Sequence, residues 1–245
     1  MKKLFMAVIA LMMTISVSAQ FYIYCSDGNI ITVDSISMVA PSELEDSTVT
    51  KDPYNGHEYV DLGLSVKWAT CNVGATKSED YGSYYAWGEI SPKSSYNWGN
   101  YKYGNGSHFT LIKYNNDSTY GPVDNKSILE AADDAAQTNW GGSWRIPTKE
   151  EAKELRSLCT WKWTTQNGVE GYKVTSKCNG NSIFLPAAGV RNGSSLYNAG
   201  NTAYYWSNSL YFSGSCYANT FEYGDRSTVI AEERSCGCSI RPVCP

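Results

Sequence analysis

Short runs of β-branched and aromatic residues dominate the hydrophobic pattern of the chain after about residue 57. Six such runs are VKWATCNVG, YYAWGEI, YKVTS, SIFLPAAG, AYYWSNSL and ANTFEYG. They are separated by glycine, asparagine and serine, which favour turns, and no repeat of fixed period links them. The pattern therefore predicts many short strands joined by turns and long loops.

Helical periodicity is found in two stretches. In residues 127–139 the apolar positions share one helical face, and two glycines follow as a stop. The residues of that face are Ile128, Leu129, Ala132, Ala135 and Ala136.

The second helix is expected to start after Thr148, in WGGSWRIPTKEE (residues 140–151). Thr148 and Glu151 have the T-x-x-E spacing of a capping box, in which each side chain bonds the other residue's backbone amide. Pro147 prevents an earlier start, and the acidic residues of the first turn suit the positive end of the helix dipole. The expected buried face is Ala152, Leu155, Leu158 and Cys159.

The N-terminal region has the signals of an exported protein. Residues 1–20 combine two lysines, an apolar stretch too short to span a membrane and the small-residue sequence Ser-Ala-Gln, which predicts a signal peptide. Residues 21–38 predict a β-hairpin around an Asp-Gly turn. Residues 39–56 predict a linker, and residues 57–245 the main domain. We therefore expect a secreted protein, located in the periplasm, at the cell surface or outside the cell, with no membrane span.

Charge argues against two classes of partner. Removing the two signal lysines leaves 18 of the 20 basic residues against 24 acidic ones, a net charge of about −6. The sequence has no basic run of the kind that binds phosphates. Nucleic acid and anionic membranes are therefore not expected as partners.

All eight cysteines lie beyond the predicted signal peptide, where disulfides can persist. A zinc site is the alternative, because Cys236 and Cys238 are close in sequence. The chain has no C-x-x-C motif, however, and only two histidines, His57 and His108. We therefore expect disulfides or buried thiols, and no metal or other cofactor.

Six separated phrases resemble one group of proteins. They are YVDLGLSVKWATCNVGA, YGSYYAWGEI, WGGSWRIPTKEEAKEL, NGNSIFLPAAGVRNG, YYWSNS and SIRPV, and they cover roughly residues 57–245. In this order they resemble exported Bacteroidota proteins related to the Fibrobacter succinogenes major paralogous domain. The Arg-x-Pro-Thr core and the C-terminal Arg strand are also similar to formylglycine-generating enzymes and to the variable proteins of diversity-generating retroelements.

This resemblance implies an α+β protein with a C-type-lectin-like fold. In such a fold two helices flank small antiparallel sheets with long loops, and the first and last strands of the domain meet. Here the domain would follow the short N-terminal β-hairpin. The meeting of those two strands implies that Cys71 and Cys244 could face each other and form a disulfide.

No catalytic set is evident in the sequence. Trp206-Ser207-Asn208 is similar to the Trp-Asn-Asp of calcium-dependent lectins, but the Glu-Pro-Asn and Gln-Pro-Asp loops of those lectins are missing. Cys236-Gly237-Cys238 does not reproduce the cysteine pair of formylglycine-generating enzymes, and Arg234 is the only neighbouring cation that could lower a thiol pKa. His57 and His108 are interpreted as surface histidines, and Arg145 and Arg241 as structural residues bonded to carboxylates or backbone carbonyls.

Residues 191–223 have the composition of a binding loop. Tyrosine, asparagine, serine and glycine surround a central tryptophan there, a mixture that gives contact area at low entropic cost. In the retroelement proteins the corresponding stretch is the ligand-binding face. The predicted ligand-binding residues are Asn192, Tyr197, Asn198, Asn201, Tyr204, Tyr205, Trp206, Asn208, Tyr211, Tyr217 and Asn219.

The alternative is that residues 191–223 are core strands and turns, and at least half of their aromatic residues should be buried in either case. A second aromatic cluster leaves the same choice between a glycan platform and a core. Its members are Tyr84, Tyr85, Trp87, Tyr96, Trp98, Tyr101 and Tyr103. Together these observations favour a non-enzymatic module that binds a glycan or protein ligand. A degenerate formylglycine-generating relative, an unrecognised hydrolase and a structural envelope or adhesin component are the alternatives.

Overall fold

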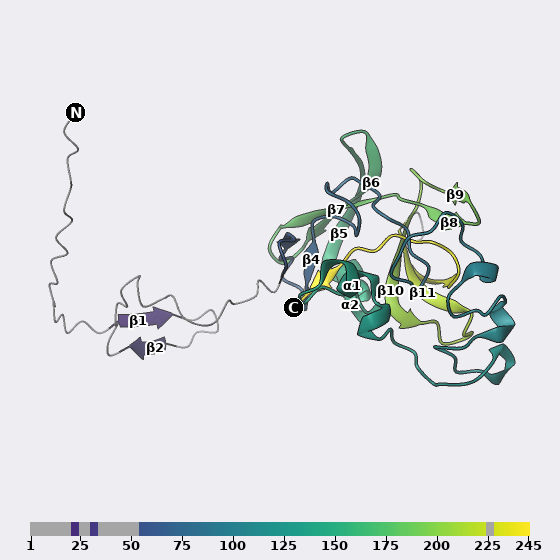
Figure 1. Cartoon of the computed structure of the whole chain (residues 1–245). Coiled ribbons are helices and arrows are strands. Elements are labelled where there is room, and N and C mark those ends of the chain that lie inside the picture. Colours follow the sequence, from purple (N-terminus) through teal and green to yellow (C-terminus); the bar gives the residue numbers. More distant parts are fainter. Residues whose placement is uncertain (1–20, 25–29, 34–53, 224–227) are drawn as a thin grey trace, which may run out of the picture. The chain divides into compact units, whose positions relative to one another are not determined.

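The computed structural model describes residues 21–24, 30–33, 54–223 and 228–245. The chain divides into two compact units, residues 1–49 and 50–245. In the first unit, β1 (Phe21–Tyr24) pairs antiparallel with β2 (Ile30–Val33), which confirms the two strands of the N-terminal hairpin (Figure 1). The predicted signal peptide, the hairpin turn and most of the predicted linker lie outside the described residues.

The second unit contains two α-helices, four short 3-10 helices and eleven strands within the described ranges (Figure 1). The helical elements are η2 (Trp98–Asn100), η3 (His108–Thr110), η4 (Ser118–Tyr120), η5 (Ala131–Asp133), α1 (Ala135–Trp140) and α2 (Lys149–Leu158). The strands are β3 (Tyr59–Val60), β4 (Lys67–Ala69), β5 (Cys159–Gln166), β6 (Val169–Ser176), β7 (Ser182–Pro186), β8 (Val190–Asn192), β9 (Ser195–Tyr197), β10 (Ala203–Leu210), β11 (Tyr217–Tyr223), β12 (Thr228–Glu233) and β13 (Val243–Cys244).

Among the strands that the structure describes, all sheet pairings are antiparallel and no sheet has more than three strands. The sheets have the orders β13-β4-β3, β5-β6-β7, β10-β11-β12 and β8-β9. Few helices combined with small antiparallel sheets define an α+β architecture. The expected YYAWGEI strand is reduced to a single bridge, Tyr85 to Cys238, within a long loop region.

The first and last strands of this unit meet in one sheet, as expected, with β4 between them. Val243 of β13 lies opposite Trp68 of β4, and Tyr59 of β3 lies opposite Ala69 on the other side. Arg145 bridges to Val243, so the strand that leads into α2 joins the same layer. The two ends of the unit are thereby held together by backbone hydrogen bonds.

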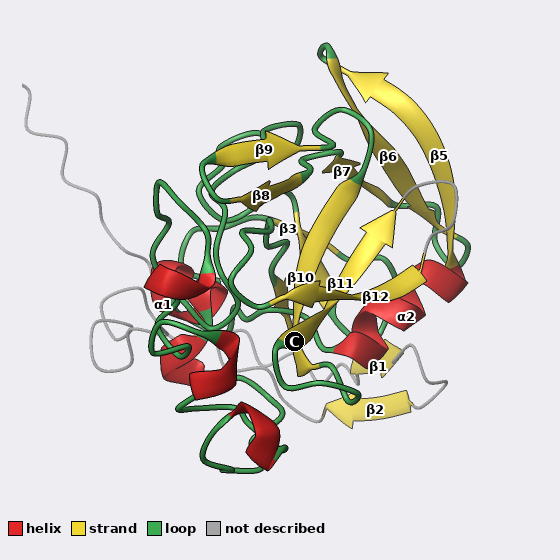
Figure 2. Cartoon of the chain, turned by 90° about the vertical axis from the view of Figure 1, so that its right-hand side faces the viewer, coloured by secondary structure: helices red, strands yellow, loops and turns green. Residues whose placement is uncertain are grey.

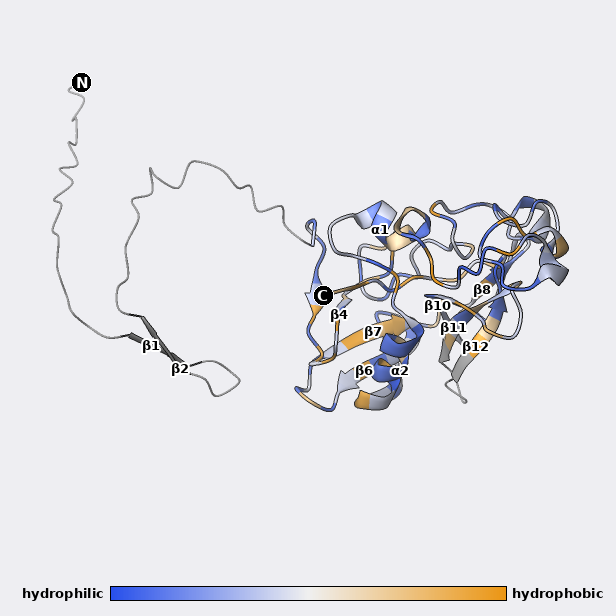
Figure 3. Cartoon of the chain, turned by 90° about the horizontal axis from the view of Figure 1, so that it is seen from below, coloured by the Kyte–Doolittle hydropathy of each residue, from blue (hydrophilic) through white to orange (hydrophobic). Residues whose placement is uncertain are grey.

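Helix α2 begins where the capping box predicts. The Glu151 amide donates to Thr148 Oγ1 at 3.1 Å, and the Thr148 amide donates to Glu151 Oε2 at 2.8 Å. Ala152 and Leu155 are fully buried, whereas Leu158 is 47% exposed and does not belong to the buried face. Figure 3 shows the hydrophobic strand β7 beside α2, whose exposed residues other than Leu158 are hydrophilic.

The helix expected over residues 127–139 is wrong in its first half. Ile128 bridges to Ser209 and is half exposed, and the Leu129 amide donates to the Asn208 carbonyl at 2.9 Å. Pairing with β10 therefore takes the backbone groups that a helix would have used. Regular helix begins only at Ala135, after Asp134 accepts a hydrogen bond from the Gln137 amide.

Strand β10 is the centre of the domain core. All eight of its residues are buried, because β11 flanks it (Figure 2) and the chain around Ser239 bridges to Tyr205. A strand covered on both faces has no solvent side, so its polar residues must bond within the protein.

Candidate functional site

Five of the eleven predicted ligand-binding residues are buried in this structure. Their exposed fractions do not exceed 8%. They are Tyr204, Tyr205, Trp206, Asn208 and Asn219. Burial inside the β10-β11 pair leaves no surface for a ligand to contact. Half of the eight aromatic side chains described in residues 191–221 are buried, as expected: Tyr204, Tyr205, Trp206 and Phe221.

The side chains of Trp206, Asn208 and Asn219 form hydrogen bonds within the core. Asn219 Nδ2 donates to the Leu210 carbonyl at 2.8 Å and to the Ser209 carbonyl at 3.2 Å. Ser209 Oγ donates to Asn208 Oδ1 at 2.9 Å, and Trp206 Nε1 donates to the Tyr85 carbonyl at 2.6 Å. These asparagines and this tryptophan therefore maintain the strand pair.

The six remaining predicted residues fall at opposite ends of β10. Asn192, Tyr197, Asn198 and Asn201 lie in or after the β8-β9 hairpin, before β10 starts. Tyr211 and Tyr217 lie after β10 ends. An eight-residue strand is roughly 25 Å long, so the two groups do not form one site.

The second aromatic cluster is core. Six of its seven members are buried and only Trp98 is half exposed. Their hydroxyls bond backbone carbonyls: Tyr84 Oη donates to Ala188, Tyr96 Oη to Tyr84 and Tyr101 Oη to Trp87. Because these groups bond inside the protein, they do not form a glycan platform.

Trp98 instead lines a surface depression that the sequence did not predict. This aromatic hollow has a volume of about 240 Å³. Its lining residues come from the loops around η2, η3 and η4 and from strands β11 and β12: Trp98, His108, Phe109, Tyr120, Cys216, Tyr217 and Glu233. Phe109 is 56% exposed and Tyr217 is 37% exposed, so apolar ring surface is open to solvent.

The rings of the aromatic hollow are packed against one another. Phe109 and Tyr120 are parallel at a centroid distance of 6.1 Å, and His108 contacts Phe109 at 3.9 Å. Trp98 lies beside His108 at a centroid distance of 5.7 Å, and its Nε1 donates to Glu233 Oε2 at 3.1 Å. The hollow thus offers aromatic faces together with a carboxylate and an imidazole that can bond hydroxyl groups.

Arg234 holds the two walls of the hollow together. Its guanidinium is completely buried and donates to the carbonyls of Lys113 at 3.0 Å, Tyr114 at 3.0 Å and Ser215 at 2.8 Å. Its Nε donates to Tyr101 Oη at 2.9 Å. One side chain therefore ties the loop that carries η3 to the turn before Tyr217.

The hollow does not present an activated nucleophile. Burial raises the pKa of the Cys216 thiol, and a hydrogen bond with Tyr120 only partly opposes this. No hydrogen bond joins His108 to Cys216 in the described part of the chain. Since a reactive cysteine needs a lowered pKa, the arrangement suits binding rather than thiol chemistry.

Apolar surface continues next to the hollow, at the turn between β10 and β11. Phe212 is 76% exposed and lines two further depressions, one shared with Asp117 and Ser118 and the other with Lys149 and Glu150. The Tyr211 amide donates to the Tyr217 carbonyl, which connects this turn to the hollow. Phe212 was not among the predicted binding residues, although it lies in the segment from which they were chosen.

The seven cysteines that the structure describes are all free thiols, including Cys71 and Cys244. The expected pairing of those two is therefore wrong in this structure. Burial raises the pKa of Cys236 and Cys238, in spite of Arg234 nearby. No group of metal-binding side chains is found among the described residues.

Arg145 and Arg241 are structural, as predicted. Arg145 donates two hydrogen bonds to the Glu151 carboxylate. Arg241 donates to four backbone carbonyls and to Asn72 Oδ1 at 2.8 Å. Of the two histidines, His57 stacks on Trp140 at 3.8 Å, while His108 lines the aromatic hollow.

No family model, no curated protein and no solved structure matches the chain. In the part of the chain that the structure describes, no helix is both long and apolar enough to cross a membrane.

Proposed function

We propose that the protein is a secreted, non-enzymatic binding module with a C-type-lectin-like domain, which recognises a glycan through the aromatic hollow. The proposal keeps the class of function and the fold family that the sequence phrases imply. It moves the binding residues from the β10 strand to the loops of η2, η3 and η4 and to the start of β11.

The observation that carries the proposal is the composition of the hollow. Pyranose rings have apolar faces that pack on aromatic rings, and Phe109, Tyr120 and Tyr217 offer such rings beside the Glu233 carboxylate. A volume of about 240 Å³ is below the ~300–1,000 Å³ of pockets for drug-sized ligands, which suits one or two sugar residues at the surface.

A protein ligand is the second candidate. Phe212 and the neighbouring depressions form exposed apolar surface beside the hollow, and aromatic anchors of this kind dominate protein interfaces. A protein ligand would depend on Phe212 more strongly than a glycan held in the hollow.

A glycan array tests the proposal, using the purified protein with and without calcium. We expect saturable, calcium-independent binding that is lost in Phe109→Ala and Tyr217→Ala, two variants that remove exposed rings without opening the core. Tyr197→Ala is the matched control, because Tyr197 is equally exposed but lies in the β8-β9 hairpin. Equal loss in Tyr197→Ala would contradict the assignment to the hollow, and a blank array would reject a glycan ligand.

A further inference from the structure

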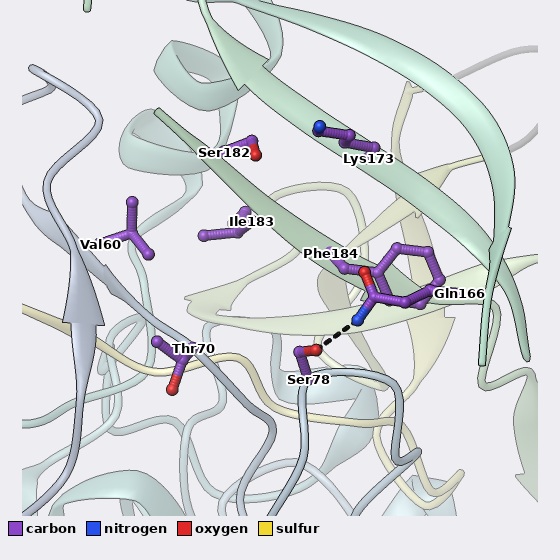
Figure 4. A pocket seen from close by; sticks show the side chains of 8 residues that line it. All are labelled: Val60, Thr70, Ser78, Gln166, Lys173, Ser182, Ile183 and Phe184. Atoms are coloured by element: carbon purple, nitrogen blue, oxygen red, sulfur yellow. Dashed lines mark hydrogen bonds between the residues drawn. The ribbon is translucent and has the colours of Figure 1, made fainter. Parts of the chain in front are cut away.

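A second depression lies on the outer face of the β5-β6-β7 sheet, and it shares no lining residue with the aromatic hollow. Its volume is about 340 Å³. Figure 4 shows the eight side chains that line it: Val60, Thr70, Ser78, Gln166, Lys173, Ser182, Ile183 and Phe184. This sheet-face hollow combines hydroxyl, amide and ammonium groups with apolar surface.

The strand register places two lysines directly opposite each other beside this hollow. Lys162 of β5 pairs with Lys173 of β6, and both are exposed. The Cβ atoms of directly opposed residues lie roughly 4.5–5.5 Å apart, and like charges at that distance destabilise a sheet. Repulsion between the two lysines therefore lowers the stability of the folded protein, and a bound anion would relieve this repulsion.

The surrounding protein does not neutralise these lysines. The register neighbours on the same sheet face are Thr160, Thr164, Gly171, Thr175, Ser182 and Phe184, none of which is acidic. Within the described residues, no hydrogen bond or ion pair engages Lys173 Nζ, Lys162 Nζ or Ser182 Oγ.

Glu79, the residue after Ser78 of the lining, accepts hydrogen bonds from three neutral side chains and keeps its negative charge, since these bonds lower its pKa to about 2. Asn167 Nδ2 donates to its Oε1 at 2.8 Å, and Gln166 Nε2 and Ser78 Oγ donate to its Oε2 at 3.2 Å and 3.0 Å. Gln166 also donates to Ser78 Oγ at 2.5 Å (Figure 4). This network fixes one wall of the hollow and leaves the lysine charge unpaired.

We infer that the sheet-face hollow is a second binding site, which takes an acidic saccharide with its carboxylate or sulfate group at Lys173. The hydroxyls of Thr70, Ser78 and Ser182 would bond the sugar hydroxyls. Lys162 lies beside the lining and adds positive charge without touching the hollow floor.

Calorimetric titration of the purified protein with matched saccharide pairs tests this site. The probes are a galacturonate oligosaccharide against its methyl ester, and a sulfated galactan oligosaccharide against its desulfated form, with inorganic sulfate as competitor. We expect at least one acidic member to bind more tightly than its neutral partner, and the binding to weaken as salt is raised. Loss of one charged hydrogen bond in Lys173→Gln should weaken it by about tenfold.

Lys153→Gln is the matched control, because Lys153 is an exposed lysine on α2 away from the hollow. Tyr217→Ala separates the two sites: it should leave the acidic-saccharide binding intact even where it abolishes binding at the aromatic hollow. Equal binding of acidic and neutral probes, no binding of either, or unchanged binding in Lys173→Gln would each overturn the inference. Complete displacement by inorganic sulfate at equal concentration would show a simple anion site and would overturn the saccharide assignment.

Discussion

Replacing Arg234 by alanine should cause a large loss of stability. The side chain is completely buried and makes four hydrogen bonds, three to backbone carbonyls and one to the Tyr101 hydroxyl. The guanidinium also lies 5.0 Å from the centroid of the Trp87 ring. Truncation removes all of these contacts at once.

The expected loss of unfolding free energy follows from the hydrogen bonds that are removed and the buried acceptors that are left without a partner. A hydrogen bond from a charged donor contributes about 1.5–3 kcal/mol, and a buried acceptor without a partner costs about 1–3 kcal/mol. Water entering the cavity satisfies part of this demand, so we expect a loss of about 4 kcal/mol, which is within the range for breaking a buried charged group's contacts. Arg234→Lys keeps the charge but presents a single nitrogen, and should lose about 2 kcal/mol.

Equilibrium urea unfolding of the wild type and both variants measures this loss. The control is Arg156→Ala, since Arg156 is an exposed arginine in the last turn of α2, where substitution should change stability by less than about 0.5 kcal/mol. If Arg234→Ala unfolds within about 1 kcal/mol of the wild type, the guanidinium does not hold the loop and turn together. The account of how the hollow is built would then be refuted.

Four further predictions concern the core, the helix cap, acid stability and the thiols. Trp206→Ala should cost about 3–5 kcal/mol in urea unfolding, because it empties a fully buried site; near-wild-type stability would contradict its burial. Thr148→Ala should cost about 1 kcal/mol and Thr148→Ser almost nothing, and equal losses would contradict the capping box. Hydrogen bonds, led by that from Asn167, lower the pKa of Glu79 to about 2 from its ordinary 4.5. Its stabilisation is therefore complete above pH 4.5 and is lost as the pH falls toward 2. Glu79→Gln should flatten the dependence of the urea midpoint on pH over that window, and an unchanged slope would contradict it. Among the seven cysteines that the structure describes, alkylation of the native protein should modify exposed Cys178 first, and a Cys71–Cys244 peptide pair in a non-reduced digest would contradict the free thiols.

Features determined by neighbouring residues could be predicted from the sequence. The start of α2 follows from a four-residue capping pattern, and the β1-β2 hairpin from apolar runs around a turn. The structural roles of Arg145 and Arg241 were also predictable, because a guanidinium has five N–H donors that backbone carbonyls and carboxylates can accept.

Features determined by distant contacts were not predictable in this way. The apolar spacing from Ile128 to Ala136 fits a helix, yet Ile128 pairs with Ser209, about eighty residues later in the chain. Composition alone likewise could not separate exposed Tyr217 from buried Tyr205, because strand β10 is buried only through its partners.

The aromatic hollow was missed for the same reason. Its walls come from residues 98–120 and from residues 216–233, and Arg234 joins them across more than a hundred residues. His108 was treated as a surface histidine because nothing in GNGSHF indicates its neighbours. The one usable signal was Trp98, the single member of its aromatic cluster that is not in the core.

The central claim is that ligand binds at the aromatic hollow, and the indole N–H resonances of the tryptophans test it most directly. The Trp98 indole donates to Glu233 at the hollow, whereas those of Trp87 and Trp206 donate to carbonyls in the core. On titration with a glycan that the array identifies, the Trp98 resonance should shift saturably while the Trp87 and Trp206 resonances stay in place. A saturable titration in which Trp98 does not move would contradict the claim.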